Sequence, residues 1–181
     1  PDGEGLVYRF GLTLTGLHTI PAPKSAFGFE CSKFDTSALN RHLEAYLDPL
    51  IKATGMKKGE HKVGWNSMHI DSWEMCTQNW GKDFREQFKK RRGYDIMPYL
   101  ATITGAVVGS TEISERFLFD YRLTAQELVL ENYIQHLKNA GESYGLSFSN
   151  EAYGMLTINS VAYGAIADVP MCEFWTDDAY N

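Results

Sequence analysis

The spacing of hydrophobic residues predicts strands in the first part of the chain, followed by a helix. Residues 6–15 are rich in β-branched and aromatic side chains with partial alternation, which is typical of one strand or two short ones. Residues 27–31 form a second short apolar run, which also predicts a strand. A helix is expected from about Ser37 to Thr54, and Pro49 predicts a kink or an early end in it. Its hydrophobic face would carry Leu39, Leu43, Tyr46, Leu47 and Leu50.

The middle of the chain combines a buried strand with helices. Residues 61–73 form the clearest candidate for a buried strand. Residues 83–92 predict a helix that ends at Gly93, with two phenylalanines, Phe84 and Phe88, facing inward. A glycine-containing turn over 104–110 and a long helix from about Glu112 to Ala140 follow.

Two further strands are expected near the end of the chain, over residues 146–149 and 162–170, and the second leads to Glu173. Strands that alternate with helices indicate βαβ units and a parallel sheet, and about four units are visible. We therefore predict an α/β fold, part of a (β/α)8 TIM-type barrel. A complete barrel needs about 250 residues, so residues 1–181 would be a single, incomplete catalytic domain of a longer protein.

An open doubly wound sheet is the alternative architecture. The chain has no G-x-G-x-x-G turn after a strand and no G-x-x-x-x-G-K-[ST] loop, so the usual nucleotide-binding versions are not indicated.

Composition narrows the function classes only a little. The net charge of −6 argues against nucleic acid, whose phosphates need a positive surface. No apolar run approaches the roughly 18 residues of a membrane helix. Three scattered cysteines, Cys31, Cys76 and Cys172, include no C-x-x-C pair and indicate neither a zinc site nor a disulfide framework. The chain begins at Pro1 without a signal-peptide pattern, which is expected of a piece of a longer protein.

Three glutamates each follow a short apolar strand: Glu74, Glu151 and Glu173. In a parallel α/β barrel the carboxyl ends of the strands converge on one mouth, where function is built. Cleavage of a glycosidic bond requires one protonated carboxyl group for the leaving group and one ionised carboxylate for water or the sugar. The alternative is structural, because a glutamate just after a strand often caps or begins the next helix.

Other polar residues accompany these glutamates. In an extended strand His69, Asp71 and Trp73 share one face, while Ser72 and Glu74 share the other. His69 could equally be a hydrogen-bonded core histidine. Asp168 is either a ligand or a turn former. The basic run 89–92 is interpreted as a helix end and not as a nucleic-acid patch.

The motifs in their order resemble the catalytic region of family 106 glycoside hydrolases, the bacterial α-L-rhamnosidases that degrade plant and pectic glycans. The resemblance extends over nearly the whole chain and is carried by 12–16, 21–23, 71–74, 91–95, 98–99, 114–117, 131–133, 167–170 and 173–175.

The resemblance implies a (β/α)8 barrel, an inverting mechanism and a calcium ion near the sugar. It would make Glu74 the general acid, Glu173 the general base and Glu151 a calcium ligand or sugar-binding carboxylate. The substrate would be an oligosaccharide or polysaccharide with a terminal α-L-rhamnoside, and the enzyme would act in the bacterial periplasm or outside the cell. Substrate contacts are expected from the remaining polar and aromatic residues at the strand ends, His69, Asp71, Trp73 and Trp175.

Two rival functions remain open on the residues alone. One is a non-catalytic carbohydrate-binding barrel that keeps the aromatic mouth without a working acid/base pair. The other is a metal-dependent barrel enzyme of another class, which a basic phosphate clamp at the strand ends would support; the sequence shows none.

Overall fold

The computed structural model describes residues 3–18, 22–60, 64–73, 78–153 and 158–174. The chain divides into two compact units. One comprises residues 1–29 and 82–124, and the other comprises residues 30–81 and 125–181. The second unit contains the sheet, and all the strand-end carboxyl groups that the structure describes belong to it.

The sheet has three parallel strands in the order β1-β2-β3. They are β1 (Ser67–Ile70), β2 (Ser147–Glu151) and β3 (Val169–Met171). Ser67 pairs with Ser147 and Ile70 with Asn150, while Glu151 pairs with Met171. The α/β class and the parallel sheet predicted from the sequence are therefore confirmed, with each strand beside its neighbour in chain order.

Helix α1 (Thr36–Thr54) begins and ends where its capping residues place it. The Asp35 carboxylate accepts hydrogen bonds from the main-chain N–H groups of Ser37 and Ala38, and Gly55 ends the helix with a φ of 65°. Pro49 does not end the helix, contrary to one of the two predicted outcomes. The leucines of the buried face, Leu39, Leu43 and Leu47, hold α1 against the core and offset the hydrogen bond that proline cannot donate.

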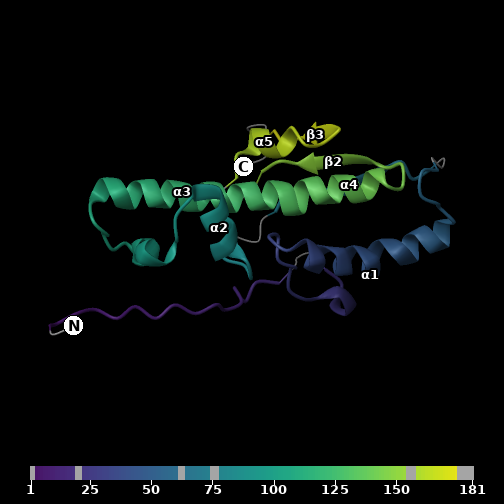
Figure 1. Ribbon diagram of the computed structural model, residues 1–181. Coiled ribbons are helices and arrows are strands. Elements are labelled where there is room, and N and C mark those ends of the chain that lie inside the picture. The colour runs from purple at the N-terminus through teal and green to yellow at the C-terminus, as the bar shows by residue number, and fades with distance from the viewer. Residues whose placement is uncertain (1–2, 19–21, 61–63, 74–77, 154–157, 175–181) are drawn as a thin grey trace, which may run out of the picture. The chain divides into compact units, whose positions relative to one another are not determined.

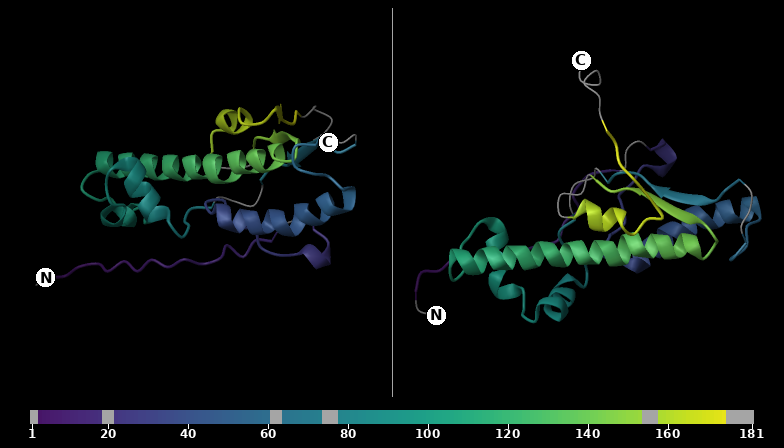
Figure 2. Two further views of the ribbon diagram at one scale, coloured as in Figure 1. Left: turned by 45° about the vertical axis from the view of Figure 1, so that its right-hand side comes forward. Right: turned by 90° about the horizontal axis from the view of Figure 1, so that it is seen from above.

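The long predicted helix is present as three consecutive segments. They are α3 (Thr111–Val129), the π-helical η3 (Leu130–Gln135) and α4 (His136–Glu142). Figure 1 shows α4 running beside β2, and the views of Figure 2 agree. A π-helical segment of this kind is not visible in the hydrophobic period, because one wider turn hardly changes which residues face the core.

The core of the second unit lies between these helices and one face of the sheet. It joins buried residues of α1, the end of α3, η3, α4, β2 and α5 (Ser160–Gly164), and Met68 and Ile70 of β1 pack against it. The buried members are Leu39, Leu43, Leu47, Val129, Ile134, Leu137, Phe148, Ile158 and Tyr163. The side chains on this face of the sheet therefore pack against the helices. The side chains at the alternate positions of each strand point to the other face.

The first unit contains η1 (Lys24–Ala26), α2 (Phe84–Arg92), η2 (Met97–Thr104) and the first part of α3. Its buried centre is aromatic, with Phe88 in contact with the rings of Tyr94 and Phe117. Helix α2 ends at Gly93, whose φ is 84°, as predicted. Its four basic residues occupy the last turn, which agrees with the structural interpretation of the run 89–92.

Four predicted strands are wrong in whole or in part. Residues 6–15 and 27–31 are extended without strand pairing, because no described segment supplies a neighbouring hydrogen-bonding edge. The predicted strand 162–170 is a strand only from Val169 onward, as part of β3. Residues 160–164 form helix α5, since the Asn159 side chain accepts hydrogen bonds from the main-chain N–H groups of Val161 and Ala162. Of residues 61–73, only Ser67–Ile70 form a strand, and residues 61–63 lie outside the described residues.

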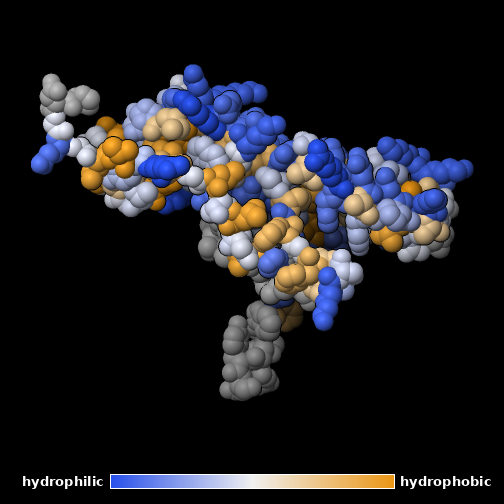
Figure 3. Space-filling view, turned by 90° about the horizontal axis from the view of Figure 1, so that it is seen from below, coloured by the Kyte–Doolittle hydropathy of each residue, from blue (hydrophilic) through white to orange (hydrophobic). Residues whose placement is uncertain are grey.

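Many large hydrophobic side chains are exposed. Leu6 is 85% and Val7 95% exposed, and Tyr46 and Leu50 of α1 also face solvent. Figure 3 shows hydrophobic residues at the surface among hydrophilic ones on the face seen from below. The sequence placed Tyr46 and Leu50 on the buried face, but only the residues spaced by four, Leu39, Leu43 and Leu47, reach the core. Among the described helices, none is long and apolar enough to cross a membrane.

The burial difference along α1 yields a stability prediction. Replacing Leu39, which is 1% exposed, by alanine should lower the free energy of unfolding by about 2–5 kcal/mol, because it removes buried methyl groups and leaves a cavity. Leu50→Ala on the same helix is the matched control and should cost less than about 1 kcal/mol, since Leu50 is 39% exposed. Urea denaturation followed by circular dichroism measures both. Equal costs at the two positions would contradict this account of the core.

Candidate active site

Three carboxyl groups lie at the carboxyl ends of the three parallel strands. Asp71 follows β1 directly, Glu151 is the last residue of β2, and Glu173 comes two residues after β3. The pairing of Ile70 with Asn150 places Asp71 beside Glu151 in register. Both Asp71 and Glu173 raise the pKa of Glu151, so each of these two groups lies within electrostatic reach of Glu151. The predicted convergence at one edge thus holds for Glu151 and Glu173, while Glu74 lies outside the described residues.

Asp71 and Glu151 form a carboxyl pair in which the two pKa values move apart. A hydrogen bond with Asp71 raises the pKa of Glu151, and desolvation and the negative charge of Asp71 add to the rise. The same hydrogen bond lowers the pKa of Asp71, helped by the main-chain N–H of Ser72, which donates to Asp71 Oδ1 at 2.8 Å. Of the two groups, Glu151 therefore binds a proton more readily and Asp71 loses its proton more readily.

One oxygen of Glu151 has no partner among the described residues. Glu151 Oε2 is buried and makes no hydrogen bond there. A buried carboxyl oxygen without a partner costs free energy unless a ligand, a water molecule or an ion satisfies it. Glu151 thus has an oxygen that can meet a group which the described residues do not supply.

His69 and Ser149 lie on the same face of the sheet as the carboxyl pair, one position earlier in each strand's alternation. Each of them comes two residues before the carboxyl residue of its own strand. His69 pairs with Ser149 in the sheet, and His69 Nδ1 lies 2.9 Å from Ser149 Oγ. His69 is exposed on this face, whereas its neighbours Met68 and Ile70 pack against the core. The interpretation of His69 as a core histidine is therefore wrong, because strand alternation directs it away from the helices.

Tyr153 is a residue of this site that sequence reasoning missed. A hydrogen bond with Ser72 lowers the pKa of Tyr153, but desolvation and a hydrogen bond to Glu173 outweigh it and leave the pKa raised. Tyr153 follows Glu151 by two residues, so strand alternation continued beyond Glu151 would have pointed to it. Its hydroxyl can donate to Glu173 and so hold that carboxylate near the end of β2.

Trp73 does not share the face of His69 and Asp71, and the parity prediction is wrong for it. Strand β1 ends at Ile70, and beyond it the chain turns so that Trp73 packs against the core. Its ring centroid lies 6.4 Å from that of Tyr133, and Lys33 Nζ lies 5.2 Å from its centroid. Its substrate-binding role stays a prediction, as does that of Trp175, which lies outside the described residues.

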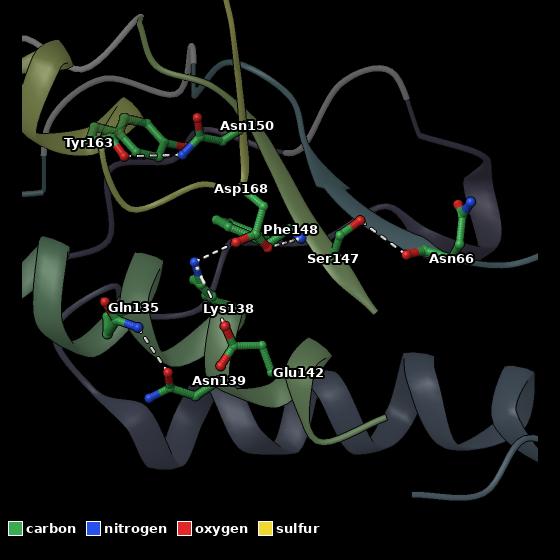
Figure 4. Close-up of polar contacts among 10 residues, drawn as sticks. All are labelled: Asn66, Gln135, Lys138, Asn139, Glu142, Ser147, Phe148, Asn150, Tyr163 and Asp168. Carbon is green, nitrogen blue, oxygen red and sulfur yellow. Dashed lines mark hydrogen bonds and ion pairs between the residues drawn. The ribbon is translucent and has the colours of Figure 1, made fainter. Parts of the chain in front are cut away.

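Asp168 has a structural role, one of the two alternatives that the sequence left open. Its carboxylate accepts hydrogen bonds from Lys138 Nζ at 2.7 Å and from the main-chain N–H of Phe148 at 2.8 Å (Figure 4). The hydrogen bond from Lys138 is the main cause of a lowered pKa for Asp168. Asp168 thereby fixes the start of β3 to β2 and to α4, and it sets the register that places Glu173 near Glu151.

The described residues contain no group of three His, Cys, Asp or Glu side chains arranged to hold a metal ion. Calcium takes six to eight oxygen ligands, chiefly from carboxylates, carbonyls and water. Asp71 and Glu151 supply two carboxylates of the right chemistry, and Glu151 offers an oxygen without a partner. The pair fits part of a calcium site.

A parallel sheet with helical connections and a carboxyl group at each strand end is typical of α/β enzymes that bind substrates at that edge. Comparison with known families identifies which enzymes these are. The chain matches the family described as alpha-L-rhamnosidase over residues 1–181, and it therefore belongs to glycoside hydrolase family 106.

Two individual proteins support this assignment. A Formosa agariphila protein named "Putative beta-glucuronidase" is 38% identical over 176 residues, which cover 97% of this chain and 15% of that protein. The structure of a rhamnosidase from Novosphingobium sp. PP1Y is similar with a TM-score of 0.79 and 32% identity, and covers 92% of this chain and 16% of the other. The chain thus spans about a sixth of the length of each. The family resemblance that the motifs indicated is confirmed, and the family is one of glycosidases.

The carboxyl pair yields a titration prediction. Asp71→Asn should lower the pKa of Glu151 toward its ordinary value, because the variant removes a neighbouring negative charge and can donate a hydrogen bond to the ionised carboxylate. Carbon-13 NMR titration of the glutamate side chains measures the change. Asp48→Asn, an exposed position on α1, is the control and should leave the titration of Glu151 unchanged. An unchanged pKa in Asp71→Asn would show that the two groups are not coupled.

Proposed function

We propose that this chain is part of the catalytic barrel of an enzyme that hydrolyses terminal α-L-rhamnosides with inversion of configuration. The observation that carries the proposal is the convergence of Asp71, Glu151 and Glu173 at the carboxyl ends of three parallel strands. Hydrolysis of a glycoside requires at least two carboxyl groups around one sugar, and this edge of the sheet supplies a set of them. Membership of a family described as alpha-L-rhamnosidase supports the substrate class that the proposal names.

Two features of the sheet support the barrel. Its strands follow one another in space in the same order as in the chain, which is the arrangement of a (β/α)8 barrel and not of a sheet whose order reverses. Helices cover the face with Phe148, while the other face carries His69, Ser149, Asp71 and Glu151. In a barrel the first face would be the outer one and the polar face would line the interior.

The proposed reaction is a single displacement. Glu74 protonates the glycosidic oxygen as the bond to the anomeric carbon breaks, and Glu173 takes a proton from the water molecule that attacks the opposite side. Glu173 is exposed, so water has access to it, and the hydroxyl of Tyr153 fixes its orientation. An inverting enzyme places the two carboxyl groups about 6.5–9.5 Å apart, which leaves room for that water.

We assign calcium binding to Glu151 with Asp71. A bound calcium ion would neutralise the crowded carboxylates and bind sugar hydroxyls. The lowered pKa of Asp71 favours the ionised carboxylate that a cation binds, and Glu151 Oε2 has no hydrogen-bond partner among the described residues.

As long as no cation is bound to it, the charge of the site favours a neutral sugar over a uronic acid. A glucuronide, the substrate type in the name of the Formosa agariphila relative, would bring another carboxylate beside Asp71, Glu151 and Glu173. Two like unit charges about 4 Å apart repel by about 4 kcal/mol near a protein surface. Among the described residues no lysine or arginine forms an ion pair with these three carboxyl groups. A rhamnoside carries no charge and avoids this repulsion.

We also propose that the enzyme acts in the periplasm or outside the cell, because rhamnosides of plant and pectic glycans are found in large polymers.

The catalytic roles predict two different kinetic defects in the full-length protein. Glu74→Gln should slow substrates with poor leaving groups by about 10²–10⁴-fold and activated aryl α-L-rhamnosides much less, because only the former need a proton donor. Glu173→Gln should slow all rhamnosides alike, since every substrate needs the attacking water. Steady-state kinetics over a leaving-group series, with proton NMR of the first-formed anomer, measures both. Sugar binding without turnover by the wild type would favour a non-catalytic carbohydrate-binding barrel instead.

Calcium removal should abolish most of the activity toward rhamnosides, and added calcium should restore it. The variant Glu151→Gln should weaken calcium binding in isothermal titration by at least about tenfold, because one carboxylate ligand is lost. Glu142→Gln, on the exposed side of α4, is the matched control and should bind calcium as the wild type does. Full activity in the presence of a chelator would contradict the calcium assignment.

A further inference from the structure

The hydroxyl group of Ser149 makes its hydrogen bond, among the described residues, to the imidazole ring of His69. Ser149 Oγ lies 2.9 Å from His69 Nδ1, and the two residues pair across β1 and β2. Ser149 is 8% exposed, whereas His69 is exposed on the open face of the sheet. A buried hydroxyl therefore holds one nitrogen of an imidazole ring that is otherwise accessible.

Ser149 is a rigid support for this contact. It belongs to the middle strand and pairs with His69 on one side and with Val169 on the other. Its neighbours in the chain, Phe148 and Asn150, are both 0% exposed. Because side chains alternate along a strand, these two buried neighbours direct the Ser149 side chain to the open face. A hydroxyl held in this way can orient a ring that contacts it.

This hydrogen bond favours one tautomer of His69. A buried serine hydroxyl carries one hydrogen, which needs an acceptor. Among the described residues, His69 Nδ1 is the acceptor that Ser149 Oγ meets. When Nδ1 accepts, the hydrogen of the neutral ring lies on Nε2. No described residue forms a hydrogen bond with Nε2, so its N–H group is a donor that a ligand can use.

The His69 ring lies near the carboxyl pair. Hydrogen bonds with Glu151 and with the main chain of Ser72 are the main causes of the lowered pKa of Asp71, and the His69 ring adds to the effect. The open face thus carries a hydrogen-bond donor on His69 followed along the strands by the acceptor oxygens of Asp71 and Glu151. Sugar hydroxyl groups both donate and accept, so this combination of groups suits a sugar.

We propose that Ser149 is a positioning residue that holds the His69 ring so that its Nε2–H donates a hydrogen bond to a hydroxyl oxygen of the rhamnosyl group. This rests on the proposed function, in which a rhamnoside binds at this edge of the sheet. Ser149 does not touch the sugar; it acts through His69. The pair supplies an uncharged donor beside the carboxyl acceptors, which matches an uncharged sugar.

Kinetics of the full-length protein with an aryl α-L-rhamnoside tests this role. Ser149→Ala releases the ring and should raise KM by about three- to tenfold with a smaller change in kcat, because a hydrogen bond made to both bound substrate and transition state is weakened. Ser149→Thr keeps the hydroxyl at a strand position that suits a β-branched residue, and it should restore KM.

Ser147→Ala is the matched control for Ser149→Ala. Ser147 lies on the same strand and the same face, but its hydroxyl donates to the main-chain oxygen of Asn66 at 3.0 Å (Figure 4). KM of Ser147→Ala should therefore equal that of the wild type. A wild-type KM in Ser149→Ala, or an equal rise in both serine variants, would overturn the positioning role.

A double variant separates positioning from general damage to the sheet. His69→Ala should raise KM at least as much as Ser149→Ala does. Adding Ser149→Ala to His69→Ala should then cause no further rise, because the ring that the hydroxyl orients is already absent. Additive rises in KM would show that Ser149 acts on the site by another route and would overturn the proposal.

A crystal structure of the full-length protein with L-rhamnose checks the contact without turnover. His69 Nε2 should lie about 2.7–3.2 Å from a sugar hydroxyl oxygen, with Nδ1 still bonded to Ser149 Oγ. In Ser149→Ala the ring should rotate or occupy two orientations. Bound rhamnose with no contact to Nε2 would overturn this inference and leave the proposed function intact. If the wild type hydrolyses no rhamnoside, the proposed function fails and this inference fails with it.

Discussion

The register between β1 and β2 is the constraint on which the candidate site depends. Ser67 pairs with Ser147 and Ile70 with Asn150, so every side chain of one strand has a fixed neighbour on the other. Phe148, fully buried beside Met68 and Ile70, decides which face of the strands packs on the helices. A slip of β2 by one residue would send Phe148 to the open face and Glu151 toward the core, which makes the register strongly specified. The polar neighbours on the open face follow from this packing.

The same register crowds groups that repel one another. Asp71 and Glu151 are brought together with Glu173 nearby, and as a result the pKa of Glu151 is raised while that of Asp71 is lowered. Such crowding disfavours the folded protein by itself and persists only because the sheet and core hold the strands in place. It is a common feature of sites that bind cations or handle protons. The glycosidase family to which the chain belongs requires chemistry of this kind.

Much of the fold could be predicted from local patterns. Asp35 before α1 and Gly93 after α2 are capping signals that act within a few residues, so the sequence located these helix ends well. The strand ends at Glu151 and Glu173 were found in the same way, from short apolar runs followed by an acid. The segments 6–15 and 27–31 were wrongly predicted to be strands, because β propensity describes a side chain's fit to a sheet and cannot supply the neighbouring strand.

The sequence by itself determined the helices, the α/β class, the acidic strand ends and the family motifs, since these depend on residue type and spacing along the chain. Only the tertiary structure decided which groups are neighbours. It placed Tyr153 beside Glu173 and packed Trp73 against the core. It brought the Asp168 carboxylate into hydrogen bonds with Lys138 and the Phe148 N–H. It also buried Lys33 between Glu30, Trp73 and Tyr133. These contacts join residues up to about a hundred positions apart, and no local spacing encodes them, because they arise from the pairing register and from packing on a shared core.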